Sequence, residues 1–140
     1  MRPAEAVSRS DAPGEKGGCV RRALVVEDEA GVRGLMALLL TLDGFEVTEE
    51  SSLPRAERLL DPGYRYDLIV TDYHLREGPP CTLSARARRL HPGVRVILTS
   101  GIRASELNCA CSPHCYSSFL PKPFTIESFR TAIREEFEHD

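Results

Sequence analysis

The sequence lacks any apolar run of about 18 residues, so no segment predicts a membrane-spanning helix. Its first 18 residues have no apolar middle of the kind found in secretory signals, and we therefore expect the chain to stay in the cytoplasm. Positive charge is not in excess, because 18 Lys and Arg stand against 21 Asp and Glu, for a net charge of −3. This balance argues against a generally basic nucleic-acid-binding protein.

The chain is also too short for several domains, since 140 residues supply about one. Five cysteines in a cytoplasmic chain are expected to be free thiols or metal ligands rather than disulfides, and Cys19 and Cys81 suggest no role. Residues 1–18 are rich in Gly, Pro, Ser and charged residues and show no periodicity. We therefore expect a disordered leader over residues 1–21 and one folded domain over residues 22–140.

Strand and helix patterns alternate throughout that expected domain. Short apolar, β-favouring runs predict strands, and apolar residues spaced three or four apart predict helices. The predicted strands are 23–26, 45–49, 67–71, 94–99 and 119–120, and the predicted helices are 30–42, 53–60, 82–90 and 125–137. This alternation predicts an α/β fold, a flavodoxin-like doubly wound five-stranded parallel sheet of order 2-1-3-4-5 with helices on both faces. Pro121 fits the edge strand of that sheet, where a missing N–H is tolerated.

Chemically active side chains follow the predicted strands at the edge where open α/β sheets bind ligands. Glu27 and Asp28 follow the first strand, Asp72 the third, Thr99 the fourth and Lys122 the fifth. Three crowded carboxylates must bind a cation or raise a pKa, and Mg²⁺ with oxygen ligands suits such a site. Mg²⁺ orients phosphoryl oxygens, and an aspartate can act as a nucleophile to give an aspartyl phosphate.

Four stretches that carry these residues resemble the receiver (CheY-like) domain of two-component response regulators, a family whose strand order is well known. They are Leu24–Glu29, Tyr66–Asp72, Val96–Gly101 and Phe119–Phe124. Each motif alone is weak, but all four occur in order at suitable spacings. The resemblance covers about residues 22–138.

The resemblance implies Mg²⁺ as the cofactor and Asp72 as the phosphoacceptor. Asp28 and Asp72 would bind the metal directly, and Glu27 would act mostly through water. The backbone carbonyl of His74 would complete the protein's share of the metal ligands, and the His74 side chain occupies a position that tunes the phosphoryl lifetime in receivers.

The same resemblance implies residues that respond to the phosphoryl group. Thr99 would contact it, and Lys122 would pair with its oxygens, with a cis peptide bond before Pro123. Phe119 would be an aromatic switch that moves inward as Thr99 shifts, by packing alone because it has no hydroxyl; a plain core role for Phe119 stays open. Ser100 is small and should leave the phosphoryl site accessible.

The resemblance therefore implies a phosphorylation-controlled signalling receiver, not an enzyme beyond its own Mg²⁺-dependent phosphorylation and dephosphorylation. A sensor histidine kinase or phosphotransfer protein would supply the phosphoryl group. In receivers a further helix, the fourth, belongs at residues 104–118, and a downstream protein would bind the face formed by this helix, the fifth strand and the last helix. No nucleic acid or membrane partner is expected, and homodimerisation stays open. The chain ends at Asp140 after the last helix, so we expect a stand-alone receiver or part of a larger protein. Residues 71–75 resemble hybrid-kinase receivers.

Two other functions remain as alternatives. A receiver-like interaction scaffold would keep the fold without being phosphorylated. A phosphatase with an aspartate nucleophile usually needs a second acid two residues on, and that position is His74.

Two segments depart from the common receiver pattern. Leu75–Pro80 replaces the usual Met-Pro and Gly-rich turn, so we expect the approach to the third helix to differ from that in other receivers. Pro113 would end any fourth helix by Ser112. The segment around it contains four soft metal ligands, Cys109, Cys111, His114 and Cys115. They could hold Zn²⁺ or sense redox, but their spacing does not match usual zinc sites and favours free thiols.

A group of basic residues is interpreted as a solvated surface rather than a nucleic-acid-binding site: Arg86, Arg88, Arg89 and Arg95.

Overall fold

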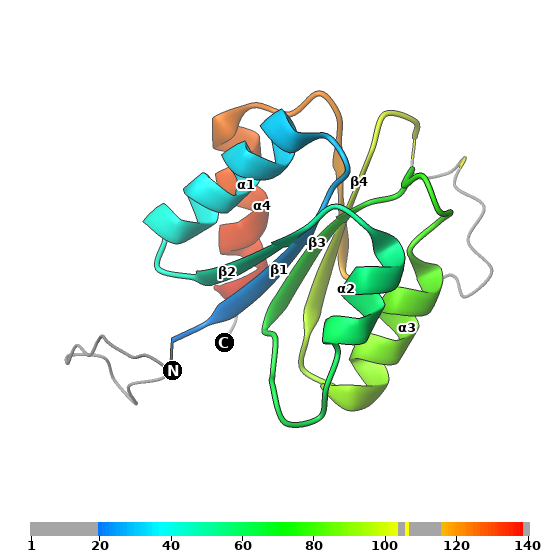
Figure 1. Ribbon diagram of the computed structural model, residues 1–140. Helices are drawn as coiled ribbons and strands as arrows, with labels where there is room; N and C mark the ends of the chain where they lie inside the picture. Colours follow the sequence, from blue (N-terminus) through cyan, green and yellow to red (C-terminus); the bar gives the residue numbers. More distant parts are fainter. Residues whose placement is uncertain (1–19, 104–105, 107–115, 139–140) are drawn as a thin grey trace.

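The computed structural model describes residues 20–103, 106 and 116–138 (Figure 1). Its strands are β1 (Arg22–Val26), β2 (Glu46–Glu50), β3 (Leu68–Asp72), β4 (Arg95–Ser100) and β5 (Ser118–Pro121). Its helices are α1 (Ala30–Leu42), α2 (Leu53–Leu59), α3 (Cys81–Leu90) and α4 (Ile126–Phe137). The predicted strands and helices are all present, with ends that differ by a residue or two. Most of the predicted leader and the Cys109–Cys115 segment lie outside the described residues.

The strands form one parallel sheet in the order β2-β1-β3-β4-β5, which confirms the predicted topology. Helices α1 and α4 cover one face of the sheet, and α2 and α3 cover the other (Figure 1). Strand β5 is an edge strand, as Pro121 indicated. None of the helices in the described part of the chain is long and apolar enough to cross a membrane.

The position of β1 in the middle of the covered sheet explains why residues 23–26 are all apolar. Ala23 and Val25 pack into the core beneath α1 and α4, whereas Leu24 and Val26 pack into the core beneath α2 and α3. All four side chains are buried, because successive residues of a strand point to opposite faces and both faces are covered. The sheet is thereby held firmly at its centre, and the ends of β1 and β3 have fixed positions.

Local hydrogen bonds start two of the helices. The Ser52 hydroxyl accepts a hydrogen bond from the Arg55 amide at the start of α2, and Pro54 lies in the first turn. Thr125 and Ser128 form a reciprocal capping box at the start of α4. Such caps satisfy amide groups that have no partner within the helix.

The end of β2 carries a charged contact that makes the stability depend on pH. Burial alone would raise the pKa of Glu50, but the Arg55 guanidinium, 3.0 Å away, and the amides of Ser51 and Ser52 lower it below the ordinary value. A carboxylate with a lowered pKa stabilises the fold above its unfolded-state pKa, and this contribution is lost as the pH falls through the folded-state pKa.

Glu50→Gln is therefore expected to destabilise the protein at neutral pH by about 1 kcal/mol. The difference from wild type should shrink as the pH falls below about 4.5, where the wild-type carboxylate becomes protonated. Urea unfolding of wild type and Glu50→Gln, from neutral pH to below about 4.5, measures this difference in the free energy of unfolding. A difference that stays constant with pH would contradict the assignment.

Cys81 corrects one expectation from the sequence. This first residue of α3 is buried and disulfide-bonded, so the expectation of free thiols or metal ligands is wrong at this position. No other cysteine lies within the described residues. The composition argument failed here because it considers only the cellular environment, whereas a disulfide also depends on which cysteines the fold brings together.

Candidate functional site

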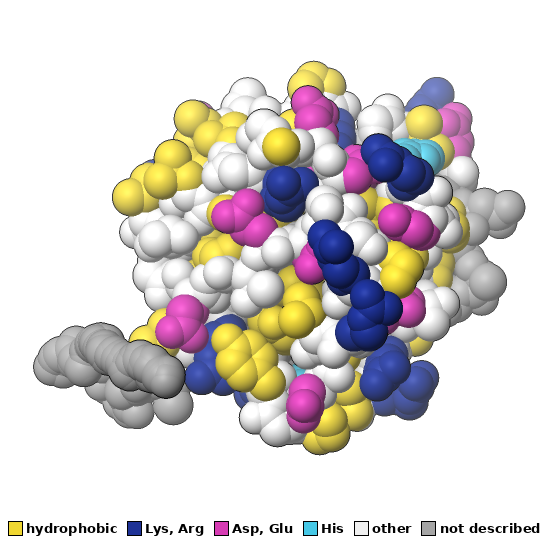
Figure 2. All heavy atoms as spheres, viewed as in Figure 1, with side chains coloured by type: hydrophobic (Ala, Val, Ile, Leu, Met, Phe, Trp, Pro, Cys, Tyr) yellow, Lys and Arg dark blue, Asp and Glu magenta, His cyan; other side chains and the backbone are white. Residues whose placement is uncertain are grey.

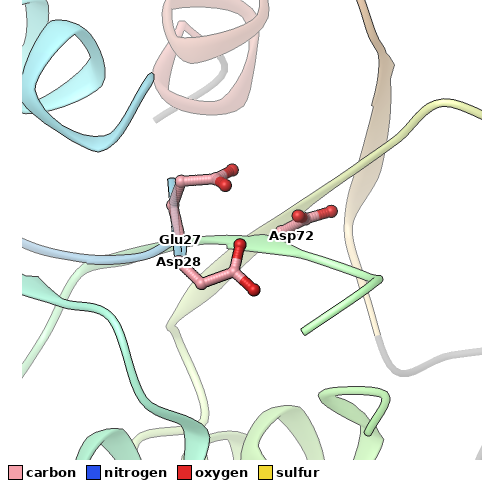
Figure 3. Close-up of side chains that lie close together, drawn as sticks. All are labelled: Glu27, Asp28 and Asp72. Carbon is pink, nitrogen blue, oxygen red and sulfur yellow. The ribbon is translucent and has the colours of Figure 1, made fainter. Parts of the chain in front are cut away.

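Three carboxylates meet beyond the ends of β1 and β3. Glu27 and Asp28 follow β1, and Asp72 ends the neighbouring strand β3, in a register that pairs Val26 with Thr71. One carboxylate oxygen from each residue lies within 4.8 Å of the other two. Figure 3 shows the three carboxyl groups facing the same space. The parallel register therefore converts positions far apart in the sequence into one acidic cluster.

Lys122 joins two of these carboxylates. Its Nζ donates to Glu27 Oε1 at 2.9 Å and to Asp72 Oδ2 at 3.3 Å. Glu27 is only 1% exposed, and its burial raises the pKa of the carboxyl although the hydrogen bond from Lys122 lowers it. Burial alone would lower the pKa of Lys122, but the hydrogen bond and charge of Glu27 and the charge of Asp72 raise it. Lys122 is therefore a firmly held cation between the two acids.

Asp72 is buried between backbone and side-chain groups that fix its orientation. Its Oδ1 accepts a hydrogen bond from the His74 amide at 3.1 Å, while Oδ2 faces Lys122. Thr99 is its register partner on β4. The Thr99 Oγ1 is buried and has no hydrogen-bond partner among the described residues. A buried hydroxyl without a partner is costly, which is typical of a group that meets a ligand.

The exposed His74 side chain contacts the end of the neighbouring strand β4. Its Nε2 lies 3.1 Å from the Ser100 Oγ, and the same oxygen accepts a hydrogen bond from the Ile102 amide. Ser100 is fully buried at the end of β4. No sequence pattern predicted that these two side chains would pair, although both positions were predicted to lie close to the site.

The donor set fits a small, hard divalent cation. Carboxylate oxygens and retained waters are the ligands that Mg²⁺ prefers, and the carboxylates together with Lys122 leave two net negative charges when ionised. Asp28 is the half-buried member of the cluster, and it lines a hollow of about 350 Å³ bounded by Tyr73, His74 and Arg76. The Thr99 hydroxyl has no hydrogen-bond partner among the described residues, and a hydroxyl can donate to an oxyanion.

The structure thus brings together Glu27, Asp28, Asp72 and Lys122, with Thr99 paired to Asp72 across the sheet. The peptide bond between Lys122 and Pro123 is cis, as the resemblance implied.

Two other predicted roles remain predictions. Phe119 lies half-buried on β5 opposite Leu98, with its ring 6.5 Å from that of Tyr116. The role of the His74 backbone carbonyl as a metal ligand also stays a prediction.

Sequence reasoning missed two arginines next to the cluster. Arg33 donates to the Glu27 backbone carbonyl at 2.9 Å and lies 3.6 Å from Glu49, so it secures the loop that carries the acids. Arg76 borders the hollow at Asp28. The helical spacing around Arg33 could have suggested which way it points, but nothing in the sequence gives the path of the turn that carries Arg76.

The fold and this cluster define the class of protein. The chain belongs to the response regulator receiver domain family, whose model matches residues 23–134. It is therefore a signalling domain of two-component systems rather than a classical enzyme.

Individual relatives agree with this assignment. Sensor kinase CckA of Brucella abortus is 30% identical over 116 residues, which make up 82% of this chain but only 12% of CckA. A response regulator receiver protein from Sinorhizobium medicae is 30% identical, with a TM-score of 0.73 over 84% of this chain and 94% of that one. TrrA of Thermotoga maritima has a TM-score of 0.69 over 84% of this chain and 99% of its own. At 19% identity, TrrA supports the fold alone.

Proposed function

We propose that this domain accepts a phosphoryl group on Asp72 and thereby controls a cytoplasmic two-component pathway. The observation that carries the proposal is the placement of Asp72, whose Oδ2 faces Lys122 while a buried, unpartnered Thr99 hydroxyl lies on the adjacent strand. A nucleophilic carboxylate, a cation for the phosphoryl oxygens and a hydrogen-bond donor are the groups that phosphoryl transfer needs. The non-phosphorylated scaffold would have no use for this combination.

The transfer itself needs no external oxidant or reductant. An oxygen of Asp72 attacks phosphorus, forming an acyl phosphate, and the bond from phosphorus to the donor's leaving atom breaks. With phosphohistidine the imidazole nitrogen keeps the electron pair, and with acetyl phosphate the acetate oxygen keeps it. The Lys122 ammonium then pairs with the transferred oxygens, and the Thr99 hydroxyl donates to one of them.

Asp28 and Asp72 would hold Mg²⁺ through their carboxylates, with Glu27 contributing mostly through water and His74 through its backbone carbonyl. When bound, Mg²⁺ supplies the positive charge that neutralises these acids and the phosphoryl oxygens. Lys122 orients Glu27 and Asp72 through a hydrogen bond to each of them. TrrA, which shares the fold, is known in complex with Mg²⁺ and BeF.

The donor would be a sensor histidine kinase or a phosphotransfer protein, and the output would be a protein contact. Strand β5, with Phe119, and helix α4 supply the described part of the face expected to change after phosphorylation. Movement of Thr99 toward the phosphoryl group would let the Phe119 ring shift inward, which would bias an existing two-state equilibrium.

Incubation with acetyl phosphate tests the proposal. We expect intact-mass spectrometry to show the addition of one phosphoryl group to wild type in the presence of Mg²⁺, and none after chelation with EDTA. Asp72→Asn should show no addition, because an amide cannot act as the nucleophile. Mg²⁺ binding without any mass gain in wild type would favour the scaffold function instead.

A further inference from the structure

We propose that Arg76 binds the incoming phosphodonor, and this inference rests on the phosphoryl transfer proposed above. Arg76 lies on the turn between β3 and α3, outside the four stretches that carry the family resemblance. Two hollows open beside the carboxylate cluster, and Asp28 and Arg76 are the two residues that line both of them. One is the hollow of about 350 Å³ already described, and the other, of about 200 Å³, extends toward Ser51 and Arg55.

The turn that carries Arg76 is anchored at both sides. Leu75 is buried in the core beneath α2 and α3, and the Gly78 amide donates to the Leu75 carbonyl at 3.0 Å. Gly78 has a φ of +127°, which favours glycine. Glu77 Oε1 accepts a hydrogen bond of 3.2 Å from the Leu53 amide, the first amide of α2. Arg76 is thus an exposed residue of a turn that is held on both sides, and its position beside Asp28 follows from these contacts.

The charges around the site explain why an arginine there would act on the donor. Lys122 is committed to Glu27 and Asp72, and Arg55 is committed to Glu50 at 3.0 Å. Arg76 makes no hydrogen bond or ion pair within the described part of the chain. Basic and acidic side chains are interspersed over the face around α2 (Figure 2), so the donor approaches a mixed rather than a uniformly positive surface.

An anionic donor that reaches Asp72 enters a cluster of three carboxylates, of which Asp72 is one. One Mg²⁺ would cancel the two negative charges that remain after Lys122, so the site would then have no net positive charge to balance the charge of the donor. A guanidinium at the rim supplies such a charge and can bind phosphoryl oxygens in a bidentate manner. Arg76 would therefore determine how tightly the donor is held rather than how fast its bound form reacts.

Arg76→Gln tests this by separating donor affinity from reaction rate. The acetyl phosphate concentration giving half-maximal phosphorylation rate should rise about tenfold, since a charge-assisted contact of this kind is lost, while the maximal rate changes little. Arg76→Lys should recover part of the affinity. Arg58→Gln, which removes an exposed arginine from the far end of α2, is the matched control and should behave as wild type.

Mg²⁺ binding gives a second readout that distinguishes donor binding from a merely electrostatic role. Removal of a cation near Asp28 should tighten Mg²⁺ binding modestly. If Arg76→Gln tightens Mg²⁺ binding but leaves the half-maximal acetyl phosphate concentration unchanged, Arg76 only neutralises Asp28 and the proposal is overturned.

Inorganic phosphate tests the same contact without any covalent chemistry. With Mg²⁺ present, phosphate should shift the NMR signal of the Arg76 Nε–H in wild type, and Arg76→Gln should bind phosphate more weakly. If wild type is not phosphorylated but this shift occurs, the proposed function fails and the Arg76 contact stands. If wild type is phosphorylated but neither the shift nor the affinity change occurs, the Arg76 proposal alone is wrong.

Discussion

Lys122→Met is expected to slow the phosphorylation of Asp72 by acetyl phosphate about a hundredfold, the typical cost of removing one preorganised donor from developing charge. Lys122 Nζ lies 3.3 Å from Asp72 Oδ2, on the side where the transferred oxygens would pair with it. The same substitution removes a positive charge from beside two carboxylates. Mg²⁺ binding should therefore become several-fold tighter while phosphorylation becomes slower.

A slower phosphorylation together with a tighter Mg²⁺ binding is what distinguishes the proposed role of Lys122 from a structural one. A variant that had merely lost its structure would lose metal binding and phosphorylation together. Stopped-flow or quenched time courses give the rate, and isothermal titration gives the Mg²⁺ affinity. Lys122→Arg, which keeps the charge, should keep Mg²⁺ affinity near that of wild type. Phosphorylation of Lys122→Met at the wild-type rate would show that Lys122 has no role in the phosphoryl transfer.

Phe129→Ala should cause the largest loss of stability, about 3–5 kcal/mol. Phe129 is fully buried on α4, where its ring packs 5.5 Å from that of Phe124 in the core shared with β1 and α1. Truncation removes both the buried surface and the packing contacts, and it leaves a cavity. Because whole domains are stable by about 5–15 kcal/mol, the variant is expected to be close to unfolding.

Urea unfolding monitored by circular dichroism measures this loss, with Ile126→Ala as the control on the same helix. The Ile126 side chain is 53% exposed, so its truncation should change the unfolding free energy by less than about 1 kcal/mol. Equal losses in the two variants would show that α4 does not pack as the structure describes.

Much of the fold could be predicted because each element carries its own local signal. Ala23–Val26 is apolar at every position, which indicated a strand covered on both faces, and Asp43-Gly44 ended the helix that precedes β2. The strand order followed from the alternation of strands and helices. The carboxylate cluster followed in turn, because parallel strands that are neighbours must place their carboxyl ends side by side.

The remaining features depend on contacts that no local pattern encodes. The hydrogen bond between His74 and Ser100 joins residues 26 positions apart, and the contact of Glu77 with the Leu53 amide depends on the path of an irregular turn. The disulfide at Cys81 likewise depends on tertiary proximity rather than on the composition of the chain. Arg76 was overlooked for the same reason, since its position is determined by how Leu75 and Glu77 anchor that turn.

The central claim is that Asp72 itself becomes the aspartyl phosphate, and borohydride trapping tests this directly. Borohydride reduces an acyl phosphate to a primary alcohol, which converts a phosphorylated aspartate into homoserine. After treatment with acetyl phosphate and Mg²⁺, peptide sequencing by mass spectrometry should find homoserine at position 72 alone, and nowhere when Mg²⁺ is withheld. Homoserine at Asp28 or another acidic position, or none at all in the Mg²⁺-treated wild type, would contradict the account.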